Sequence, residues 1–121
     1  MTETARIPTE IRLKKAEKIL EVDFDDGASF RLPAELLRVE SPSAEVQGHG
    51  PSEKKIVAGK RDVAIDEVSP VGNYAVCIKF SDNHDSGIYS WETLYAFGVH
   101  GDAIWNEYLE NLEKAGLSRD A

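Results

Sequence analysis

The fold is decided by one stretch of strand-like sequence, Leu20-Glu-Val-Asp-Phe-Asp-Asp-Gly-Ala-Ser-Phe-Arg-Leu32. Apolar and polar residues alternate on both sides of Asp26-Gly27, which is typical of strands that bury one face. Glycine tolerates the positive φ angles of a tight turn, so Asp26-Gly27 predicts a hairpin. Residues 9–14 alternate in the same way. We therefore expect three consecutive antiparallel strands at the start of the domain.

After this hairpin, Pro33 is expected to begin a short helix over residues 34–38, because proline suits the first helical position. Residues 41–59 are rich in glycine and proline and predict a long loop. Period-two patterns then predict further strands over residues 61–68, 73–80 and 87–90.

Two helical segments are expected near the C-terminus. The first is a helical turn over residues 91–97 that Gly98 ends. The second is a longer helix with Asp102 as N-cap and Gly116 as its C-terminal stop. Its apolar stripe is typical of a helix that packs on a sheet, and consists of Ile104, Trp105, Tyr108, Leu109 and Leu112.

These patterns predict an α+β fold. We expect a mainly antiparallel β-sheet of five to seven strands, with a short helix after the third strand and a C-terminal helix packed on the sheet. Residues 1–8 are expected to be a flexible arm, residues 9–116 a single domain, and residues 117–121 a tail.

Charge and composition exclude several classes of protein. The chain has 22 acidic and 14 basic residues, a net charge of −8. This argues against a general nucleic-acid binder and against docking on anionic membranes. No signal peptide and no run of roughly 18 apolar residues is visible, so we expect a cytoplasmic protein. Cys77 is the single cysteine and is interpreted as an inert thiol in a strand.

The segment from Ser81 to Trp91 carries the strongest candidate for a functional residue, because His84 lies in a turn with Asp82 and Asp85 beside it. Neighbouring carboxylates can orient an imidazole, and His with Asp is also metal-ligand chemistry. The same acids are what a turn needs to hydrogen-bond its backbone. Both interpretations stay open.

The long loop offers further candidates. His49 stands between Gly48 and Gly50, where the backbone could approach a ligand or simply form a loop. Ser41 and Ser43 could be paired with His49 or His84 as in a hydrolase, yet no Gly-x-Ser-x-Gly nucleophile motif is present.

Two segments resemble a known family. One spans residues 36–46 and includes Leu37-Arg38 and Ser41-Pro42-Ser43. The other runs from Phe80 through His84 to Tyr95. Together they resemble the N-terminal domain of gamma-butyrobetaine hydroxylases, which also occurs as a stand-alone bacterial protein of uncharacterised function. The chain is similar also to a domain attached to some iron–sulfur cluster carrier ATPases. The resemblance covers about residues 7–115.

The resemblance implies where a zinc site would lie in this chain, and it also implies that most of the zinc ligands have been lost. In the hydroxylases three Cys, in a Cys-Pro-Cys-x-x-Cys pattern, and one His hold a structural zinc. The matching residues here are Ser41, Ser43 and Val46, and only His84 is kept. Hydroxyl and isopropyl groups do not replace thiolates as zinc ligands. The catalytic iron of the hydroxylases belongs to another domain, so their activity does not carry over.

We therefore expect a non-catalytic accessory or adaptor domain that binds a protein partner, in the context of iron–sulfur or metalloprotein biology, with no cofactor. A homodimer is also compatible with the sequence. The expected interaction loop comprises Ser41, Ser43, Glu45, His49, Asp82 and Asp85. The alternative is a domain that binds zinc or iron through His84 and His49, with Asp82 or Glu45 as further ligands.

Overall fold

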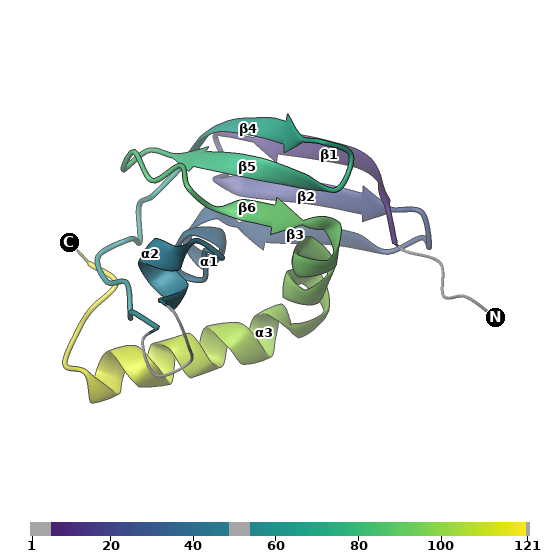
Figure 1. Ribbon diagram of the computed structural model, residues 1–121. Coiled ribbons are helices and arrows are strands. Elements are labelled where there is room, and N and C mark those ends of the chain that lie inside the picture. Colours follow the sequence, from purple (N-terminus) through teal and green to yellow (C-terminus); the bar gives the residue numbers. More distant parts are fainter. Residues whose placement is uncertain (1–5, 49–53, 121) are drawn as a thin grey trace.

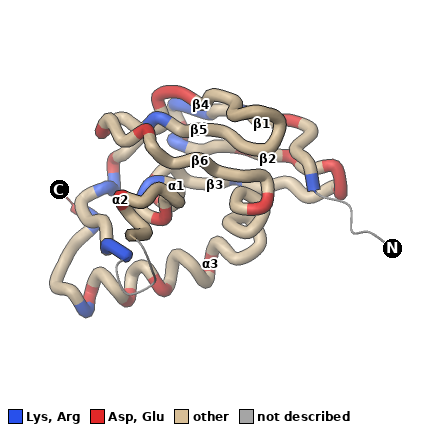
Figure 2. The backbone as a smooth tube through the Cα atoms, in the orientation of Figure 1, with Lys and Arg blue, Asp and Glu red and all other residues tan. Residues whose placement is uncertain are grey.

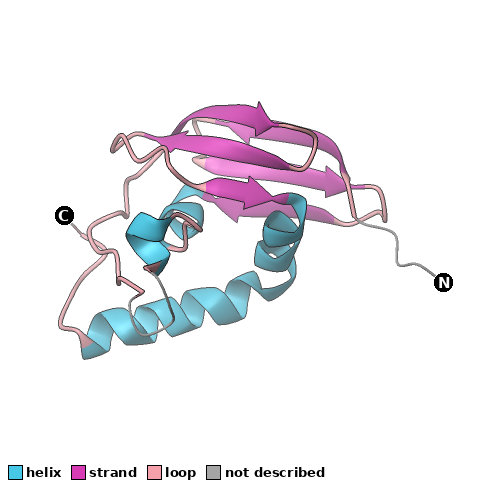
Figure 3. Cartoon of the chain, viewed as in Figure 1, coloured by secondary structure: helices cyan, strands magenta, loops and turns pink. Residues whose placement is uncertain are grey.

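The computed structural model describes residues 6–48 and 54–120, and the chain folds as α+β. Figure 3 shows the strands gathered on one side of the molecule and the helices on the other. The elements are, in order, β1 (Pro8–Lys14), β2 (Ile19–Phe24), β3 (Ser29–Pro33), α1 (Ala34–Val39), α2 (Ala44–Gln47), β4 (Ile65–Val71), β5 (Ala75–Phe80), β6 (Ile88–Ser90) and α3 (Trp91–Lys114).

The predicted meander of three strands is confirmed. β1 pairs with β2, and β2 pairs with β3, both antiparallel. Gly27 has a φ of +90°, and its N–H donates to the Phe24 carbonyl at 3.1 Å. The hairpin turn thus uses the glycine as the sequence predicts.

The prediction of one sheet of five to seven strands is wrong. The described residues form two antiparallel sheets of three strands each, with the orders β1-β2-β3 and β4-β5-β6. Both sheets contribute buried residues to one core, for example Leu20 and Val22 from the first, and Ile78 and Tyr89 from the second. Packing face to face buries both apolar faces without any hydrogen bond between the sheets. Alternation predicts which face is buried, but it does not reveal which strands pair.

The C-terminal helix also differs from the prediction. Residues 91–114 form one helix, whose N-cap is Ser90 rather than Asp102. The Ser90 hydroxyl accepts a hydrogen bond from the Thr93 N–H at 3.1 Å. Gly98 lies inside this helix and does not end it. Its lack of a side chain allows α3 to approach Phe30 of β3, because a Cβ atom there would overlap the Phe30 ring. Figure 1 shows that α3 is bent, with its first turns beside β3 and β6. The predicted stop at Gly116 is confirmed by its φ of +69°.

The loop and tail regions hold more structure than their composition indicates. The predicted loop over residues 41–59 contains the short helix α2. Beyond α3, the carbonyls of Ser118 and Arg119 accept hydrogen bonds from the N–H groups of Gly59 and Arg61 at 2.9 and 3.0 Å. The C-terminal segment is thereby held against the body of the domain.

Basic and acidic residues are interspersed along the strands, turns and α3 (Figure 2). No helix in residues 6–48 or 54–120 combines the length and apolar character of a membrane span.

Candidate functional site

The candidate site is a buried cluster of Ser41, Ser43 and His84. Ser41 and Ser43 flank Pro42 in the segment that joins α1 to α2, and His84 lies in the turn between β5 and β6. The His84 Nε2 atom is 3.0 Å from Ser41 Oγ and 3.4 Å from Ser43 Oγ. The two hydroxyl oxygens are 3.2 Å apart. Residues separated by about forty positions in the sequence therefore meet in one hydrogen-bonded group.

The turn that carries His84 is held by its own backbone and by Asp82. The His84 carbonyl accepts from the Phe80 N–H at 2.9 Å, and Asp82 Oδ1 accepts from the His84 N–H at 3.2 Å. Asn83 adopts a positive φ of +69°, which asparagine tolerates. Asp82 thus has the backbone-bonding role that one interpretation of the sequence expected.

The cluster is closed to solvent. Ser41 is fully buried, and Ser43 and His84 are 6% exposed. Burial and, next, the positive charge of Arg38 lower the pKa of His84 below its usual value, so the imidazole is neutral in the folded protein. Below about pH 6.5 the unfolded chain takes up a proton that the folded site resists, and stability falls as the solution is acidified.

Arg38 and Lys60 also surround Asp82. The Arg38 Nε atom is 2.8 Å from Asp82 Oδ2, and the Lys60 Nζ atom is 2.6 Å from the same oxygen. Burial opposes ionisation of Asp82, but these two cations outweigh it and hold the pKa of Asp82 at about 2. This ion pair could not be predicted from the sequence, because Arg38 and Asp82 are 44 positions apart and no local pattern links them.

The pH dependence of stability should report this ion pair. The folded-state pKa of Asp82 lies below its unfolded value, so ionised Asp82 stabilises the fold above about pH 4, and this contribution disappears as the pH falls toward 2. A difference of this size corresponds to about 2 kcal/mol. Asp82→Asn should therefore be less stable than the wild type at pH 6 and nearly equal to it at pH 2, as measured by urea denaturation. A constant difference at every pH would contradict this assignment.

Glu45 and Asp85 lie at the surface beside the cluster. Glu45 Oε2 is 3.6 Å from His84 Nδ1, and Glu45 Oε1 accepts from Ser86 Oγ at 2.8 Å. The Asp85 carbonyl, rather than its carboxylate, is used locally, since it accepts from the Cys77 thiol at 3.0 Å. Burial raises the pKa of that thiol above its usual value, which keeps it protonated. The predicted ligand His49 lies outside the described residues.

Gly87 encloses the cluster from the β6 side. A Cβ atom at Gly87 would be 2.5 Å from Ser41 Oγ and 3.0 Å from Tyr89 Cε1. The Tyr89 hydroxyl in turn donates to the Leu37 carbonyl beneath the cluster. Sequence reasoning missed both residues, since the contact that requires a glycine at position 87 involves a serine 46 positions away.

Gly87→Ala should destabilise the protein by about 1–3 kcal/mol, the usual range for overpacking a filled interior. In the Ser41→Ala background, Gly87→Ala should destabilise the protein less, because the closest atom, Ser41 Oγ, is absent. Chemical denaturation of the four proteins of this double-mutant cycle measures the coupling. Equal effects of Gly87→Ala in both backgrounds would show that Ser41 Oγ is not the atom that excludes a side chain.

Comparison with known proteins identifies the family. The pattern described as gamma-butyrobetaine hydroxylase-like, N-terminal matches residues 11–95. The chain belongs to this family. The resemblance noted in the sequence is thereby confirmed. A search of curated proteins gave no match.

Solved structures agree with this membership of the hydroxylase-like N-terminal family. Two NMR solution structures are 47% and 45% identical to this chain, with TM-scores of 0.83 and 0.82; the alignments cover 97% and 98% of this chain and 92% and 90% of the others. A crystal structure of a protein of unknown function from Acidithiobacillus ferrooxidans ATCC 23270, assigned to the DUF971 family, is 46% identical over 72% of this chain and 86% of its own, with a TM-score of 0.61.

The donor set does not fit the Cys3His zinc site that the resemblance implies. Ser41 and Ser43 contribute neutral hydroxyls, Val46 is a buried residue without a donor, and only His84 is a zinc ligand. Within the two described ranges, no three His, Cys, Asp or Glu side chains are grouped so that they could hold a metal ion. The cluster therefore lies where the resemblance implies a metal site, and its chemistry is that of a hydrogen-bonded core.

Proposed function

We propose that this protein is a non-catalytic adaptor domain that binds a protein partner. The observation that carries the proposal is the closed Ser41–Ser43–His84 cluster. Its serine oxygens are engaged by the imidazole and by each other, and Ser41 is fully buried. Although Ser41, His84 and Glu45 stand in the order of a hydrolytic triad, a nucleophile must reach a substrate. Burial of Ser41 and the crowding at Gly87 oppose that reaction.

The open surface supports the same function. A cavity of about 460 Å³ lies between β3, α1 and α3, away from the cluster. Its lining includes Leu32, Leu36, Phe97 and Trp105 and contains no Ser, His or Cys. Apolar surface with a charged rim suits recognition of another molecule better than a covalent reaction. As the resemblance implies, some members of the family are domains of larger hydroxylases or iron–sulfur carrier ATPases, which favours a metalloprotein or iron–sulfur protein as the partner.

Affinity capture tests this function directly. The tagged full chain is incubated with native lysate, and bound proteins are identified by mass spectrometry beside an unrelated acidic domain of similar size. We expect at least one partner that is retained reproducibly by this chain alone. Failure to retain any such partner, under both low and physiological salt, would count against the adaptor function.

Metal binding through His84 is the competing function, and the proximity of Glu45 to His84 Nδ1 is the contact that favours it. Elemental analysis of protein purified without chelator decides between the two. Stoichiometric zinc or iron that disappears in the His84→Ala variant would support the metal site. We expect sub-stoichiometric metal that does not change in this variant.

A further inference from the structure

β3 is an edge strand whose outer side has no neighbouring strand among the described residues. Hydrogen bonds at both ends of the β2–β3 ladder show which backbone groups are used. The Phe24 N–H donates to the Ala28 carbonyl at 2.8 Å, and the Ala34 N–H donates to the Lys18 carbonyl at 2.9 Å. The residue pairs Phe24–Ala28 and Lys18–Ala34 are therefore both hydrogen-bonded pairs of the antiparallel ladder.

Hydrogen-bonded and non-hydrogen-bonded pairs alternate along an antiparallel ladder. The five pairs between these two ends run from Asp23–Ser29 to Ile19–Pro33. Phe30 and Leu32 consequently bond to β2, whereas the N–H and C=O groups of Ser29 and Arg31 point to the open side. Within the described chain, no backbone hydrogen bond from outside the sheet reaches these groups.

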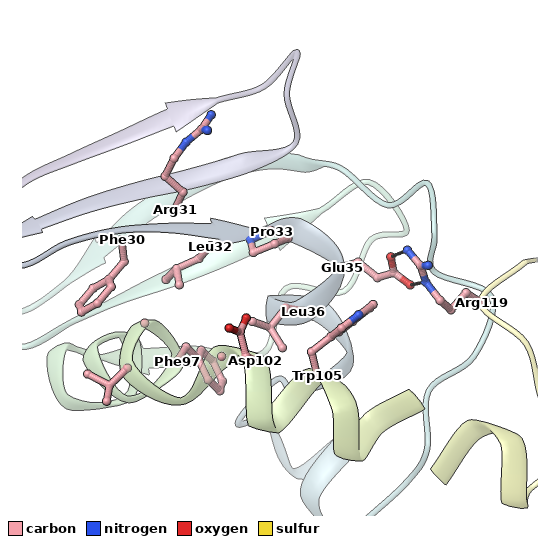
Figure 4. A pocket seen from close by; sticks show the side chains of 13 residues that line it. Phe30, Arg31, Leu32, Pro33, Glu35, Leu36, Phe97, Asp102, Trp105 and Arg119 are labelled. Atoms are coloured by element: carbon pink, nitrogen blue, oxygen red, sulfur yellow. Dashed lines mark hydrogen bonds and ion pairs between the residues drawn. The ribbon is translucent and has the colours of Figure 1, made fainter. Parts of the chain in front are cut away.

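The 460 Å³ cavity runs along this open edge. Four consecutive residues of β3, from Phe30 to Pro33, line it. Side chains of a strand alternate between its two faces, so a cavity lined by consecutive residues follows the edge of the backbone itself. Figure 4 shows Phe30 and Leu32 facing α3 across the groove, while the Arg31 side chain points away from it. A groove with both apolar and charged lining residues thus lies beside strand donors and acceptors that have no backbone partner among the described residues.

The charges of the groove leave a single acid without a partner. Arg31 is bonded to Glu17 and Glu21, and Arg119 makes two hydrogen bonds to Glu35. Asp102 is exposed on the α3 wall and makes no ion pair with any described residue. With a net charge of −8 for the whole chain, the groove complements a basic rather than an acidic occupant.

We propose that an extended segment of a protein partner adds as a strand to the open edge of β3, places an apolar side chain in the groove, and pairs a Lys or Arg with Asp102. This inference rests on the adaptor function proposed above and names the surface and the partner chemistry. Main-chain hydrogen bonds to an edge strand supply affinity, and a neighbouring pocket supplies specificity. A second copy of this chain carries the same net charge of −8, so long-range repulsion disfavours it as the occupant.

Two substitutions at Arg31 distinguish the contribution of its backbone N–H to peptide binding from the contribution of its side chain. Arg31→Pro removes the outward N–H but no hydrogen bond to β2, and proline is tolerated at such an edge position. Arg31→Ala keeps the N–H and removes the side chain. We expect peptides selected from a displayed library of random nine-residue sequences to alternate apolar residues with Lys or Arg. Their affinity should fall at least about ten-fold with Arg31→Pro, the equivalent of about 1.4 kcal/mol, and change less than about three-fold with Arg31→Ala.

Amide exchange provides a readout that does not depend on the proline variant folding. In the wild type, the Ser29 and Arg31 amides should exchange quickly with solvent and slow down when a selected peptide is added. Asp102→Asn should lower the affinity for the peptide at low salt, and it should lower this affinity less at high salt, where the charge is screened.

Selection of no peptide, peptides that bind both Arg31 variants equally, or unchanged exchange at Ser29 and Arg31 would overturn the inference. Slow exchange of these amides that depends on protein concentration, without peptide, would also overturn it by assigning the edge to a second copy. If a captured partner still binds the Arg31→Pro variant, the β3 edge is not the binding surface, but the proposed adaptor function is retained. If no partner is captured at all, the adaptor function itself is refuted.

Discussion

The triple variant Ser41→Cys/Ser43→Cys/Val46→Cys should bind one zinc ion per chain, whereas the parent protein should hold none at these positions. The physical reason is the geometry of the cluster. A tetrahedral site with Zn–S bonds of about 2.3 Å and Zn–N bonds of about 2.0–2.1 Å separates sulfur from nitrogen by about 3.5 Å. The two serine oxygens already lie 3.0 and 3.4 Å from His84 Nε2. Small outward shifts would make room for the ion.

Zinc content by elemental analysis and the cobalt-substituted absorption spectrum measure this gain. Thermal stability of the triple variant should also rise when zinc is added, because binding to the folded state alone stabilises it. The matched control is the same triple variant with His84→Ala, which should bind zinc much more weakly. If the triple variant stays metal-free while folded, position 46 does not converge with the three positions of the Ser41–Ser43–His84 cluster.

Gly98→Ala should destabilise the protein by about 1–3 kcal/mol, although alanine is the better helix former by about 1 kcal/mol. A Cβ atom at this position would stand 2.2 Å from Cγ of the Phe30 ring. Phe30 packs between Phe24 and Tyr95, with ring centroids 6.0 and 5.3 Å away, so it has little freedom to move. The helix would have to separate from β3.

Gly101→Ala is the matched control within the same helix. Its Cβ would have Leu36 Cδ2 as nearest neighbour at 3.9 Å, an ordinary van der Waals distance. This variant should be as stable as the wild type or more stable, by up to about 1 kcal/mol, because only helix propensity changes. Urea denaturation of both variants measures the contrast. Stabilisation by both substitutions would show that α3 does not require close contact with Phe30.

Much of the fold could be predicted, because strands and turns depend on local sequence patterns. Alternation at residues 20–32 and the glycine at position 27 correctly predict the β2–β3 hairpin, and Gly116 correctly predicts the helix end. Helix α3 shows the limit of such reasoning. Gly98 locally resembles a helix stop, but its role depends on an aromatic ring from β3, 68 positions earlier in the chain.

The candidate site divides in the same way. The sequence singled out His84, Ser41 and Ser43, and the family resemblance paired them, but neither could supply their burial or their hydrogen bonds. Nothing in the sequence paired Arg38 or Lys60 with Asp82, because this ion pair requires three separate segments to pack together. The open edge of β3 was also invisible, since it depends on the division of six strands into two sheets.

By itself the sequence determined the strand periodicity, the turns and the absence of cysteine at positions 41, 43 and 46, because these properties belong to residue types and to neighbours along the backbone. Only the tertiary structure decided that His84 faces two serines, that Gly98 continues a helix, and that β3 keeps one edge unpaired. Each of these depends on which distant surfaces pack together, and a repeating pattern of apolar residues specifies a buried face without specifying its partner.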